Sequence, residues 1–338
     1  MPFITNIKIL KYITHVLLFI ILIQSCTLKK EESCIVDLYQ DKETFKYQLV
    51  IPVEIEDSII YFLWDTGSED SFIDYHLVSE LGLQKQNRPV IKTFIRSYDE
   101  VTDTFFHNNI KLKIGDFTIN PGLYLDDTEF TSKSRVGITP PIKGLLGQDI
   151  ISQFQWLFDF EKSKVIISKE QIHMDDYDKS KELVLPFRYL SDSKKIPIID
   201  LNLDTIDSKE FYFDTGSRYS IVFFDKFYLY PILIMEEDIT ESIPCEHILK
   251  SGEEQNPGTI ILYNNISLNN FDILNTALLN RNSYLKINFI TVNFIFQFEK
   301  MYYNPEEKEI NFIEYRQRNH PSGDESKFIY YLDDLEKN

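Results

Sequence analysis

The sequence is poor in several residue types on which other protein classes depend. Among its 338 residues there is one alanine, Ala277, and there are only three cysteines and six histidines. Because alanine is the best helix former, its scarcity argues against a helical protein. The cysteines, Cys26, Cys34 and Cys245, form no CxxC pair and no cluster with histidine, which excludes a disulfide framework and a structural zinc site. A single bridge between Cys34 and Cys245 stays open.

Basic side chains are also in the minority. The chain has 35 Lys and Arg against 53 Asp and Glu, which gives a formal net charge of -18. Binding of phosphate groups needs a basic surface, so nucleic acid is not expected as a partner. What the chain does contain is 43% hydrophobic residues, with 26 Phe and 20 Tyr. Aromatic side chains favour pleated sheets, and the composition therefore predicts a globular, all-β protein.

The first 25 residues have the pattern of a bacterial signal peptide. Lys8 and Lys11 precede an apolar stretch, residues 12–23, which is shorter than the roughly 20 residues needed to span a bilayer. The stretch ends in Leu22-Ile23-Gln24-Ser25-Cys26, which resembles a lipobox whose cysteine, Cys26, becomes lipidated and N-terminal. A plain signal peptide or a stub anchor with an incidental cysteine is the alternative.

The segment after Cys26 reads Thr27-Leu28-Lys29-Lys30-Glu31-Glu32. A lysine followed by two acids resembles the surface-export signal of Bacteroidetes lipoproteins, and a charged, solvated tether is the alternative. We therefore expect residues 1–25 to be a lipoprotein signal peptide and residues 26–44 to be the lipidated cysteine and its tether. The lipid would anchor the protein firmly, since each CH2 group buried in the bilayer contributes about 0.8 kcal/mol. We expect the membrane to be the bacterial outer membrane. A genuine export signal would place it on the cell surface.

One tetrapeptide occurs twice and is the most informative feature of the chain. Asp65-Thr66-Gly67-Ser68 recurs as Asp214-Thr215-Gly216-Ser217. A run of residues that favours a buried strand leads into each copy, residues 59–64 in the first case and 210–213 in the second. Two copies in matching contexts indicate a repeat rather than a chance match.

Other parts of the chain correspond in the same order. Upstream of the motifs, Ile51-Pro52-Val53 parallels Ile196-Pro197-Ile198, and downstream residues 145–154 align without gaps on residues 289–298. A strand–turn–strand pattern follows each downstream segment. This ordered agreement indicates an internal duplication, with the crossover between the two copies inside residues 168–181.

The repeat sets the expected organisation of the folded part. The expected regions are a first lobe over residues 45–175, a second lobe over 176–315 and a polar tail over 316–338. Helix is sparse. Residues 74–81, followed by Gly82, carry capping residues at both ends, and residues 150–154 favour a short turn of helix.

A hydrophobic strand, an Asp-Thr-Gly-Ser loop and a later aliphatic–aliphatic–Gly segment, Leu145-Leu146-Gly147, together resemble the aspartic peptidase superfamily, both retropepsin-like and pepsin-like. The likeness covers most of residues 45–315. It implies two homologous retropepsin-like β-lobes related by pseudo-twofold symmetry, with few short helices. Retropepsins pair two identical chains to bring two such loops together. Here both loops lie in one chain, so we expect a monomer that acts on a polypeptide substrate.

The same resemblance assigns the catalytic dyad to Asp65 and Asp214. Two carboxylates within hydrogen-bond reach cannot both ionise, so one stays protonated. The ionised partner can take a proton from a water that attacks the scissile carbonyl, while the protonated partner donates to the carbonyl oxygen as charge develops there. Neither a metal nor a cofactor is needed. The resemblance thus predicts an aspartic endopeptidase.

Four further loop residues have supporting roles in this scheme. Gly67 and Gly216 would permit the tight turns and the close approach of the two loops. Thr66 and Thr215 would lock the loops together by reciprocal hydrogen bonds, as they do in the family.

The serines that end the motifs, Ser68 and Ser217, could each donate a hydroxyl to the adjacent carboxylate. A donor to the charged form of a carboxylate lowers its pKa. Retropepsins often carry alanine at this position, so we expect a more acidic pH optimum than theirs.

A β-hairpin flap is expected to cover the cleft. In the first lobe the candidate is residues 93–106, in which Tyr98 could cap the cleft; an ordinary surface tyrosine is the alternative. In the second lobe the equivalent is residues 247–259, where Gly252 and Pro257-Gly258 indicate turns.

The second lobe departs from the family pattern. Thr291 stands where the first lobe has Gly147, and Asn293 stands where it has Asp149. In the family the glycine lets this segment run close beside the catalytic loop, so a β-branched threonine could shift the loop or narrow the space behind Asp214. Two functions therefore stay open: a lipid-anchored peptidase, or a non-catalytic lipoprotein that binds extended peptide by strand pairing. A structural envelope lipoprotein without a ligand is a third.

Overall fold

In the computed structural model the described residues form mostly β-strands, arranged in two large sheets and one two-stranded sheet. The all-β prediction is therefore confirmed. The structure describes residues 33–39, 49–82, 93–96, 100–103, 105–107, 110–126, 142–174, 177–203, 206–216, 221–223, 239–247, 256–268, 271–281, 288–295 and 298–315. We call the described residues up to 174 the first half and those from 177 onward the second half.

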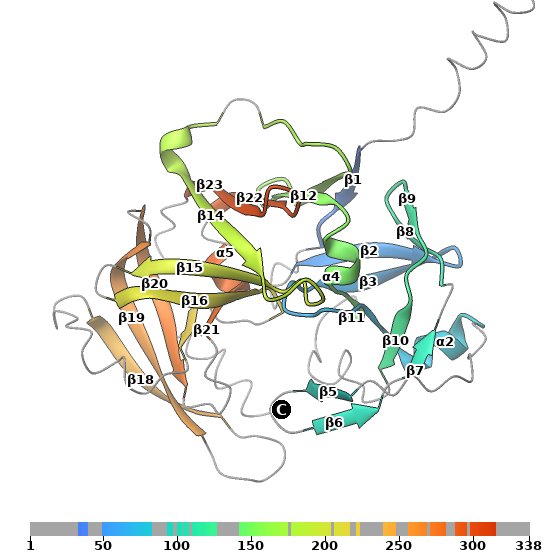
Figure 1. Ribbon diagram of the computed structural model, residues 1–338, viewed down its shortest axis with the longest axis horizontal. Coiled ribbons are helices and arrows are strands. Elements are labelled where there is room, and N and C mark those ends of the chain that lie inside the picture. The colour runs from blue at the N-terminus through green and yellow to red at the C-terminus, as the bar shows by residue number, and fades with distance from the viewer. Residues whose placement is uncertain are drawn as a thin grey trace, which may run out of the picture.

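The first half forms an eight-stranded sheet, which lies on the right of Figure 1. In spatial order its strands are β7 (Phe105–His107), β10 (Leu123–Asp126), β4 (Phe72–Asp74), β11 (Ile142–Leu146), β3 (Ser58–Trp64), β2 (Val50–Ile55), β8 (Leu112–Ile114) and β9 (Phe117–Ile119). Strand β3 lies between β11, its parallel neighbour, and β2, its antiparallel neighbour. Because β3 ends at Trp64, it delivers the first Asp-Thr-Gly loop.

The second half has a corresponding sheet, on the left of Figure 1. In spatial order its strands are β15 (Pro197–Leu203), β16 (Ile206–Asp214), β21 (Asn288–Thr291), β17 (Ile221–Phe223), β20 (Phe271–Arg281), β19 (Asn256–Leu268) and β18 (Ile239–His247). Strand β16 lies between β21, which is parallel to it, and β15, which is antiparallel. It ends at Asp214 and so delivers the second loop.

Six strands join the two halves across the top of Figure 1. Their order is β1 (Ser33–Asp37), β13 (Lys164–Ser168), β12 (Gln155–Asp159), β22 (Phe298–Asn304), β23 (Glu309–Tyr315) and β14 (Glu182–Tyr189). The β12–β13 hairpin of the first half therefore lies beside the β22–β23 hairpin of the second. Strands β12 and β22 are antiparallel, with Trp156 opposite Tyr303. Strand β14 also pairs with β15, which links this layer to the second sheet.

The strands around the two motifs pair in the same way. In the first half β3 is parallel to β11, β11 is antiparallel to β4, and β4 is parallel to β10. In the second half β16, β21, β17 and β20 repeat these three pairings in the same order. A short helix follows the inner parallel strand in each half, α4 (Gln148–Ile151) and α5 (Val292–Ile295). These helices begin at positions that the gapless sequence alignment makes equivalent.

The predicted helix after the first motif is present as α2 (Tyr75–Glu80). Asp74 caps it, since its Oδ1 accepts a hydrogen bond of 2.8 Å from the backbone N–H of His76. Gly82 has a φ of 66°, as expected of a residue that ends a helix. The turn predicted over residues 150–154 begins two residues earlier, as α4, and the crossover contains the short 3-10 helix η1 (Lys179–Lys181).

Two expectations from the sequence need correction. Residues 26–44 were assigned to a tether, but Ser33–Asp37 form β1 at the edge of the layer that joins the halves. The upstream alignment is also wrong in register. Val50 lies opposite Leu63, and Ile198 lies opposite Tyr212. Val50 and Ile198 are therefore equivalent, three residues away from the correspondence read in the sequence.

One hydrophobic core runs through both halves. At its centre Trp64, the residue before the first motif, packs edge-to-face against Phe158 and Tyr303, with ring centroids 4.9 Å and 5.5 Å away. Phe158 belongs to β12 and Tyr303 to β22, so strands of both halves hold the end of β3 in place. Buried aromatic pairs of this geometry contribute about 0.5–1.5 kcal/mol beyond their buried area.

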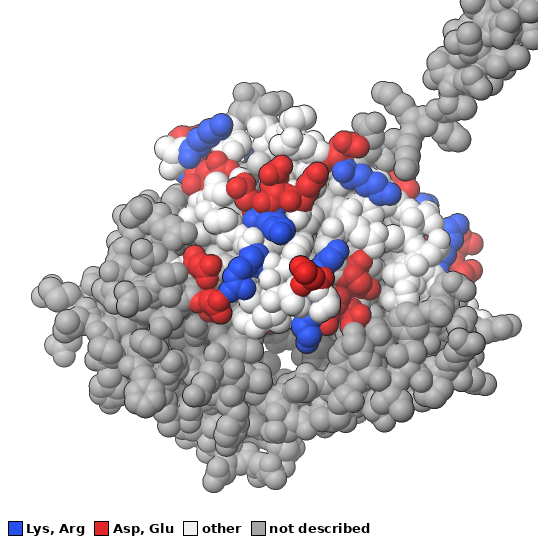
Figure 2. All heavy atoms as spheres, in the orientation of Figure 1, with Lys and Arg blue, Asp and Glu red and all other residues white. Residues whose placement is uncertain are grey.

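Acidic and basic side chains are interspersed over the described part of the face in Figure 2. Among the described residues no helix is both long enough and apolar enough to cross a membrane. Cys34 lies buried on β1, where its thiol donates to the carbonyl oxygen of Ile114 at 3.6 Å. Cys245 lies on β18, at the other end of the thirteen-strand order.

Candidate active site

The two Asp-Thr-Gly loops lie against each other. A Cβ atom built on Gly67 would lie 2.5 Å from Oδ1 of Asp214, and one built on Gly216 would lie 2.2 Å from Oδ2 of Asp65. Each glycine therefore touches the carboxylate of the opposite loop. A real Cβ atom does not come so close to another heavy atom, so the approach of the loops requires glycine at both positions.

The threonines of the two motifs cross-link the loops. Thr66 Oγ1 donates to the carbonyl oxygen of Phe213 at 2.6 Å, and Thr215 Oγ1 donates to that of Trp64 at 2.7 Å. Each hydroxyl also accepts from the backbone N–H of the other threonine, at 3.0 Å and 3.2 Å. Both threonines are fully buried. The reciprocal bonds expected from the sequence are thus present, and they satisfy polar groups that would be costly to leave unpaired.

The loops also orient the two carboxylates in the same manner. The backbone N–H of Gly67 donates to Oδ1 of Asp65 at 2.8 Å, and that of Gly216 donates to Oδ1 of Asp214 at 2.9 Å. Asp65 and Asp214 are both partly exposed. Each carboxylate therefore has one oxygen fixed by its own loop, while the side chain stays accessible from outside.

A second segment runs directly behind the first loop. The Asp65 N–H donates to Leu146 O at 3.0 Å, and a Cβ on Gly147 would lie 2.3 Å from Asp70 O. Glycine at position 147 is therefore a steric requirement of the first half. The neighbouring N–H of Gln148 donates to Ser68 O at 2.9 Å, which continues the attachment along the loop.

Asp149 closes a small polar network behind this loop. Its Oδ1 accepts from Ser71 Oγ at 2.6 Å and from the Ile150 N–H at 3.0 Å, while Ser71 Oγ accepts from the Gly147 N–H at 2.9 Å. Burial raises the pKa of Asp149 to about 6; the Ser71 hydrogen bond opposes the shift, and the nearby charge of Asp70 adds to it. In the second half Asn293 stands at the position of Asp149 and does not titrate.

The replacement of glycine by Thr291 leaves the second loop in place. Strand β21 pairs in parallel with β16 as far as Thr291, which lies opposite Asp214. Thr215 and Gly216 make the same contacts to the first loop as Thr66 and Gly67 make to the second. The displacement that the sequence led us to consider is therefore not found in the backbone pairing.

The predicted role of Ser68 is wrong. Its hydroxyl donates to the carbonyl oxygen of Asp70 at 2.8 Å and so has no proton left for the carboxylate of Asp65. Ser68 therefore tightens its own turn. Ser217 lies outside the described residues. The shift in pH optimum that we expected from the two serines loses its basis in the first half.

The predicted flaps fall on hairpins. Strands β5 (Thr93–Arg96) and β6 (Glu100–Asp103) pair antiparallel and appear below the sheets in Figure 1. In the second half the corresponding hairpin is formed by β18 and β19. Tyr98, the candidate cap of the cleft, lies outside the described residues, as does Cys26, the candidate lipidation site.

Sequence reasoning missed two contacts beside the first loop. Lys194, from the turn between β14 and β15, forms an ion pair of 3.1 Å with Glu69. Gln148 donates through its side-chain amide to Thr66 O at 3.3 Å. Both bring a side chain to the loop from a distant part of the sequence. The sequence offered a signal for only one of them: Gln148 directly follows the glycine of the aliphatic–aliphatic–Gly segment.

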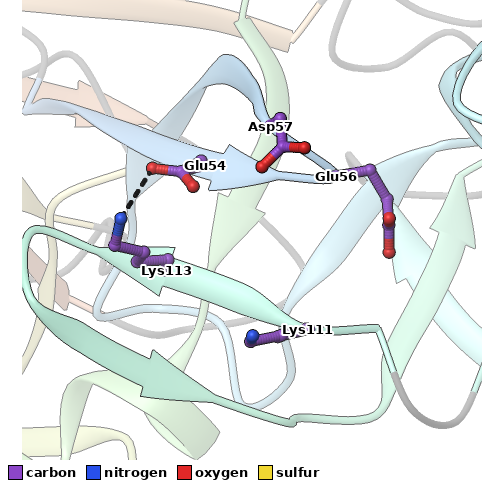
Figure 3. Close-up of a pocket in the computed structure, with 5 residues that line it drawn as sticks. All are labelled: Glu54, Glu56, Asp57, Lys111 and Lys113. Atoms are coloured by element: carbon purple, nitrogen blue, oxygen red, sulfur yellow. Dashed lines mark hydrogen bonds and ion pairs between the residues drawn. The ribbon is translucent and has the colours of Figure 1, made fainter.

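A separate hollow lies at the opposite end of β3 from the motif (Figure 3). It is lined by Glu54, Glu56, Asp57, Lys111 and Lys113. Lys113 Nζ lies 3.1 Å from Glu54 Oε2, and Glu56 and Asp57 form the two-residue turn between β2 and β3 with positive φ angles. The charges are those of a solvated hairpin end. Among the described residues no group of His, Cys, Asp and Glu is arranged to hold a metal ion.

Comparison with known proteins places the first motif in a family. The model of the aspartyl protease family matches residues 51–150, which run from β2 to α4 and include Asp65 and Gly147. The comparison with curated proteins gave no match. The match covers the loop, the strand that delivers it and the segment behind it. Residues 51–150 of this chain therefore form a domain of the aspartic peptidase superfamily.

Proposed function

We propose that the protein is an aspartic endopeptidase whose catalytic dyad is Asp65 and Asp214. One observation carries the proposal: each motif glycine lies against the carboxylate of the other loop, at 2.5 Å and 2.2 Å from a Cβ position. That reciprocal approach brings two partly exposed carboxyl groups into one place, where they share a proton. The match of residues 51–150 to the aspartyl protease family supports the same reaction.

The reaction follows from the chemistry of the pair. The ionised carboxylate takes a proton from water as that water attacks the carbonyl carbon of the scissile peptide bond. The protonated carboxyl donates to the carbonyl oxygen while negative charge develops on it. The tetrahedral intermediate then collapses as a proton passes to the leaving nitrogen, and the dyad returns to its starting protonation. The threonine bonds between the loops keep the two groups in register throughout.

The similar strand pairing of the halves supports a duplicated, two-lobed enzyme that works as a monomer, with lobes over residues 45–175 and 176–315. A polypeptide in the cleft would be covered by the hairpins β5–β6 and β18–β19. We also infer from the signal-like N-terminus that Cys26 carries a lipid and anchors the enzyme in the bacterial envelope. Intact mass spectrometry of the mature protein would show the added lipid, and its absence would refute the anchor.

The test is cleavage of an unstructured peptide mixture by the purified full chain, read by mass spectrometry from acidic to neutral pH. We expect Asp65→Asn and Asp214→Asn each to abolish cleavage. Asp200→Asn, the same change on an exposed residue of β15, is the matched control and should retain it. Cleavage that survives both dyad substitutions would refute the proposal. Peptide binding without cleavage would favour the non-catalytic alternative.

A further inference from the structure

Gln148 is a fully buried amide behind the first catalytic loop. It is the first residue of α4. Its Nε2 donates to the carbonyl oxygen of Thr66 at 3.3 Å, and its Oε1 accepts from the hydroxyl of Tyr303 at 3.3 Å. Burial of a polar side chain is costly unless its donors and acceptors are paired. Gln148 is therefore held in one orientation between the two halves of the molecule.

The direction of these hydrogen bonds is fixed by chemistry. A carbonyl oxygen only accepts, so the NH2 group of Gln148 must face Thr66 and its oxygen must face Tyr303. Tyr303 then uses its single proton on Gln148. Burial raises the pKa of Tyr303 well above its ordinary value, so the hydroxyl remains a donor.

This chain of donors ends on the peptide group that holds Asp65. The carbonyl of Thr66 and the N–H of Gly67 belong to one peptide unit, and that N–H donates to Asp65 Oδ1 at 2.8 Å. A donor on the carbonyl side of a peptide polarises the unit and strengthens the hydrogen bond that its N–H makes. Gln148 therefore increases the stabilisation of negative charge on Asp65 without touching the carboxylate.

The second half has no such side chain at the corresponding position. Val292 is the first residue of α5, as Gln148 is of α4, and valine has no group that donates a hydrogen bond. The Gly216 N–H donates to Asp214 at 2.9 Å, much as the Gly67 N–H donates to Asp65 at 2.8 Å. The two carboxylates thus differ in the residue that follows the strand behind each loop, Gln148 in the first half and Val292 in the second.

We propose that Gln148 is a positioning residue that makes Asp65 the ionised member of the dyad and leaves the shared proton on Asp214. The proposal rests on the proposed function and deepens it. Asp65 is then the base that takes the proton of the attacking water. Asp214 is the acid that donates to the carbonyl oxygen.

The first test does not depend on catalysis. In the full chain labelled with 13C at the aspartate carboxyl carbon, NMR follows the ionisation of each carboxyl with pH, and Asp65→Asn and Asp214→Asn assign the two signals. We expect Asp65 to ionise at lower pH than Asp214. Tyr303→Phe keeps the ring but frees the Gln148 amide, and it should narrow the gap between the two titrations. Ionisation of Asp214 first, or a gap unchanged by Tyr303→Phe, would overturn the proposal whether or not the protein cleaves peptides.

The second test uses the enzyme reaction. Gln148→Met keeps the length of the side chain and removes the donor, so the acidic limb of the kcat/KM profile should move to higher pH by about half a unit. Tyr303→Phe should move it in the same direction by less. Gln171→Met, an exposed residue of the crossover, is the control and should not move it. A uniform loss of rate with an unmoved limb would assign Gln148 a purely structural role. No cleavage by the unaltered chain would refute the function and leave the NMR result to stand alone.

Discussion

The two Asp-Thr-Gly loops are alike where they face each other and different where they face their own halves. Across the interface, Thr66 and Thr215 exchange equivalent hydrogen bonds, and Gly67 and Gly216 each meet the opposite aspartate. Behind the loops Gln148 is replaced by Val292 and Gly147 by Thr291. Residues through which the two loops contact each other are therefore the same in both halves. Residues behind each loop take no part in that contact and can differ.

The largest effect should come from the glycines between the loops. Gly67→Ala and Gly216→Ala each place a methyl group within 2.5 Å of a carboxylate oxygen of the opposite loop. A displacement of reacting groups on the order of 1 Å costs roughly 100-fold in rate, so we expect both to lower kcat/KM by about that factor, measured on a peptide substrate. Equal losses would support matched roles.

Gly82→Ala is the control for the glycine substitutions. Gly82 has a positive φ, which Gly67 and Gly216 do not have, and a Cβ there meets no atom within 4 Å. It should cost about 1 kcal/mol of folding free energy and leave kcat/KM unchanged. A Gly216→Ala variant with full activity would break the comparison, because it would mean that the two loops do not touch in solution.

An exchange of residues 147 and 291 should act very unequally. Gly147→Thr would force a side chain onto the carbonyl of Asp70, 2.3 Å from the Cβ position, and should destabilise the protein by about 3 kcal/mol. Thr291→Gly should change kcat/KM by no more than about threefold, because the β16–β21 pairing already places the second loop correctly. Urea unfolding and peptide cleavage measure the two effects. A large gain of activity in Thr291→Gly would contradict the equivalence of the loops.

Asp149 should contribute a gradual pH dependence to the stability of the protein. Because its folded pKa of about 6 lies above the ordinary value of 3.8, the folded state binds a proton that the unfolded state has lost between these values. The free energy of unfolding should therefore fall as pH rises through this window, by up to about 3 kcal/mol. Asp149→Asn gives the first half the residue of the second and should remove that fall, as measured by urea unfolding at pH values on either side of the window. An unchanged pH dependence would show that other groups cause it.

Most of the candidate site could be predicted from sequence because its chemistry is local. The tetrapeptide fixes the carboxylate, the turn and the cross-linking hydroxyl within four residues. The gapless downstream alignment made the first residues of α4 and α5 equivalent, but it predicted a helical turn only over residues 150–154 and none at α5. The hydrogen bonds of Gln148 to Thr66 and Tyr303 could not be predicted, since Tyr303 reaches Gln148 only when β22 packs beside β12. The prediction for Ser68 was wrong because a hydroxyl has one proton, and Ser68 donates it to the carbonyl oxygen of Asp70.

The errors in the fold have a common physical origin. The stretches at Val50 and Ile198 are apolar at most consecutive positions, so the sequence alone does not select one among the possible registers. Pairing across the sheet decides among them, and it made the residues opposite Leu63 and Tyr212 equivalent. Strand β1 was missed because five alternating residues beside a charged segment resemble a tether until β13 supplies their partner.

The most direct test of the central claim, that one chain holds one complete site made by both halves, is the stoichiometry of an inhibitor. A peptide analogue with a tetrahedral hydroxyl-bearing carbon in place of the scissile carbonyl would mimic the intermediate. Titration calorimetry combined with native mass spectrometry should find one analogue bound per monomeric chain, with binding lost equally in Asp65→Asn and Asp214→Asn. One analogue per two chains, or binding indifferent to either substitution, would contradict the claim.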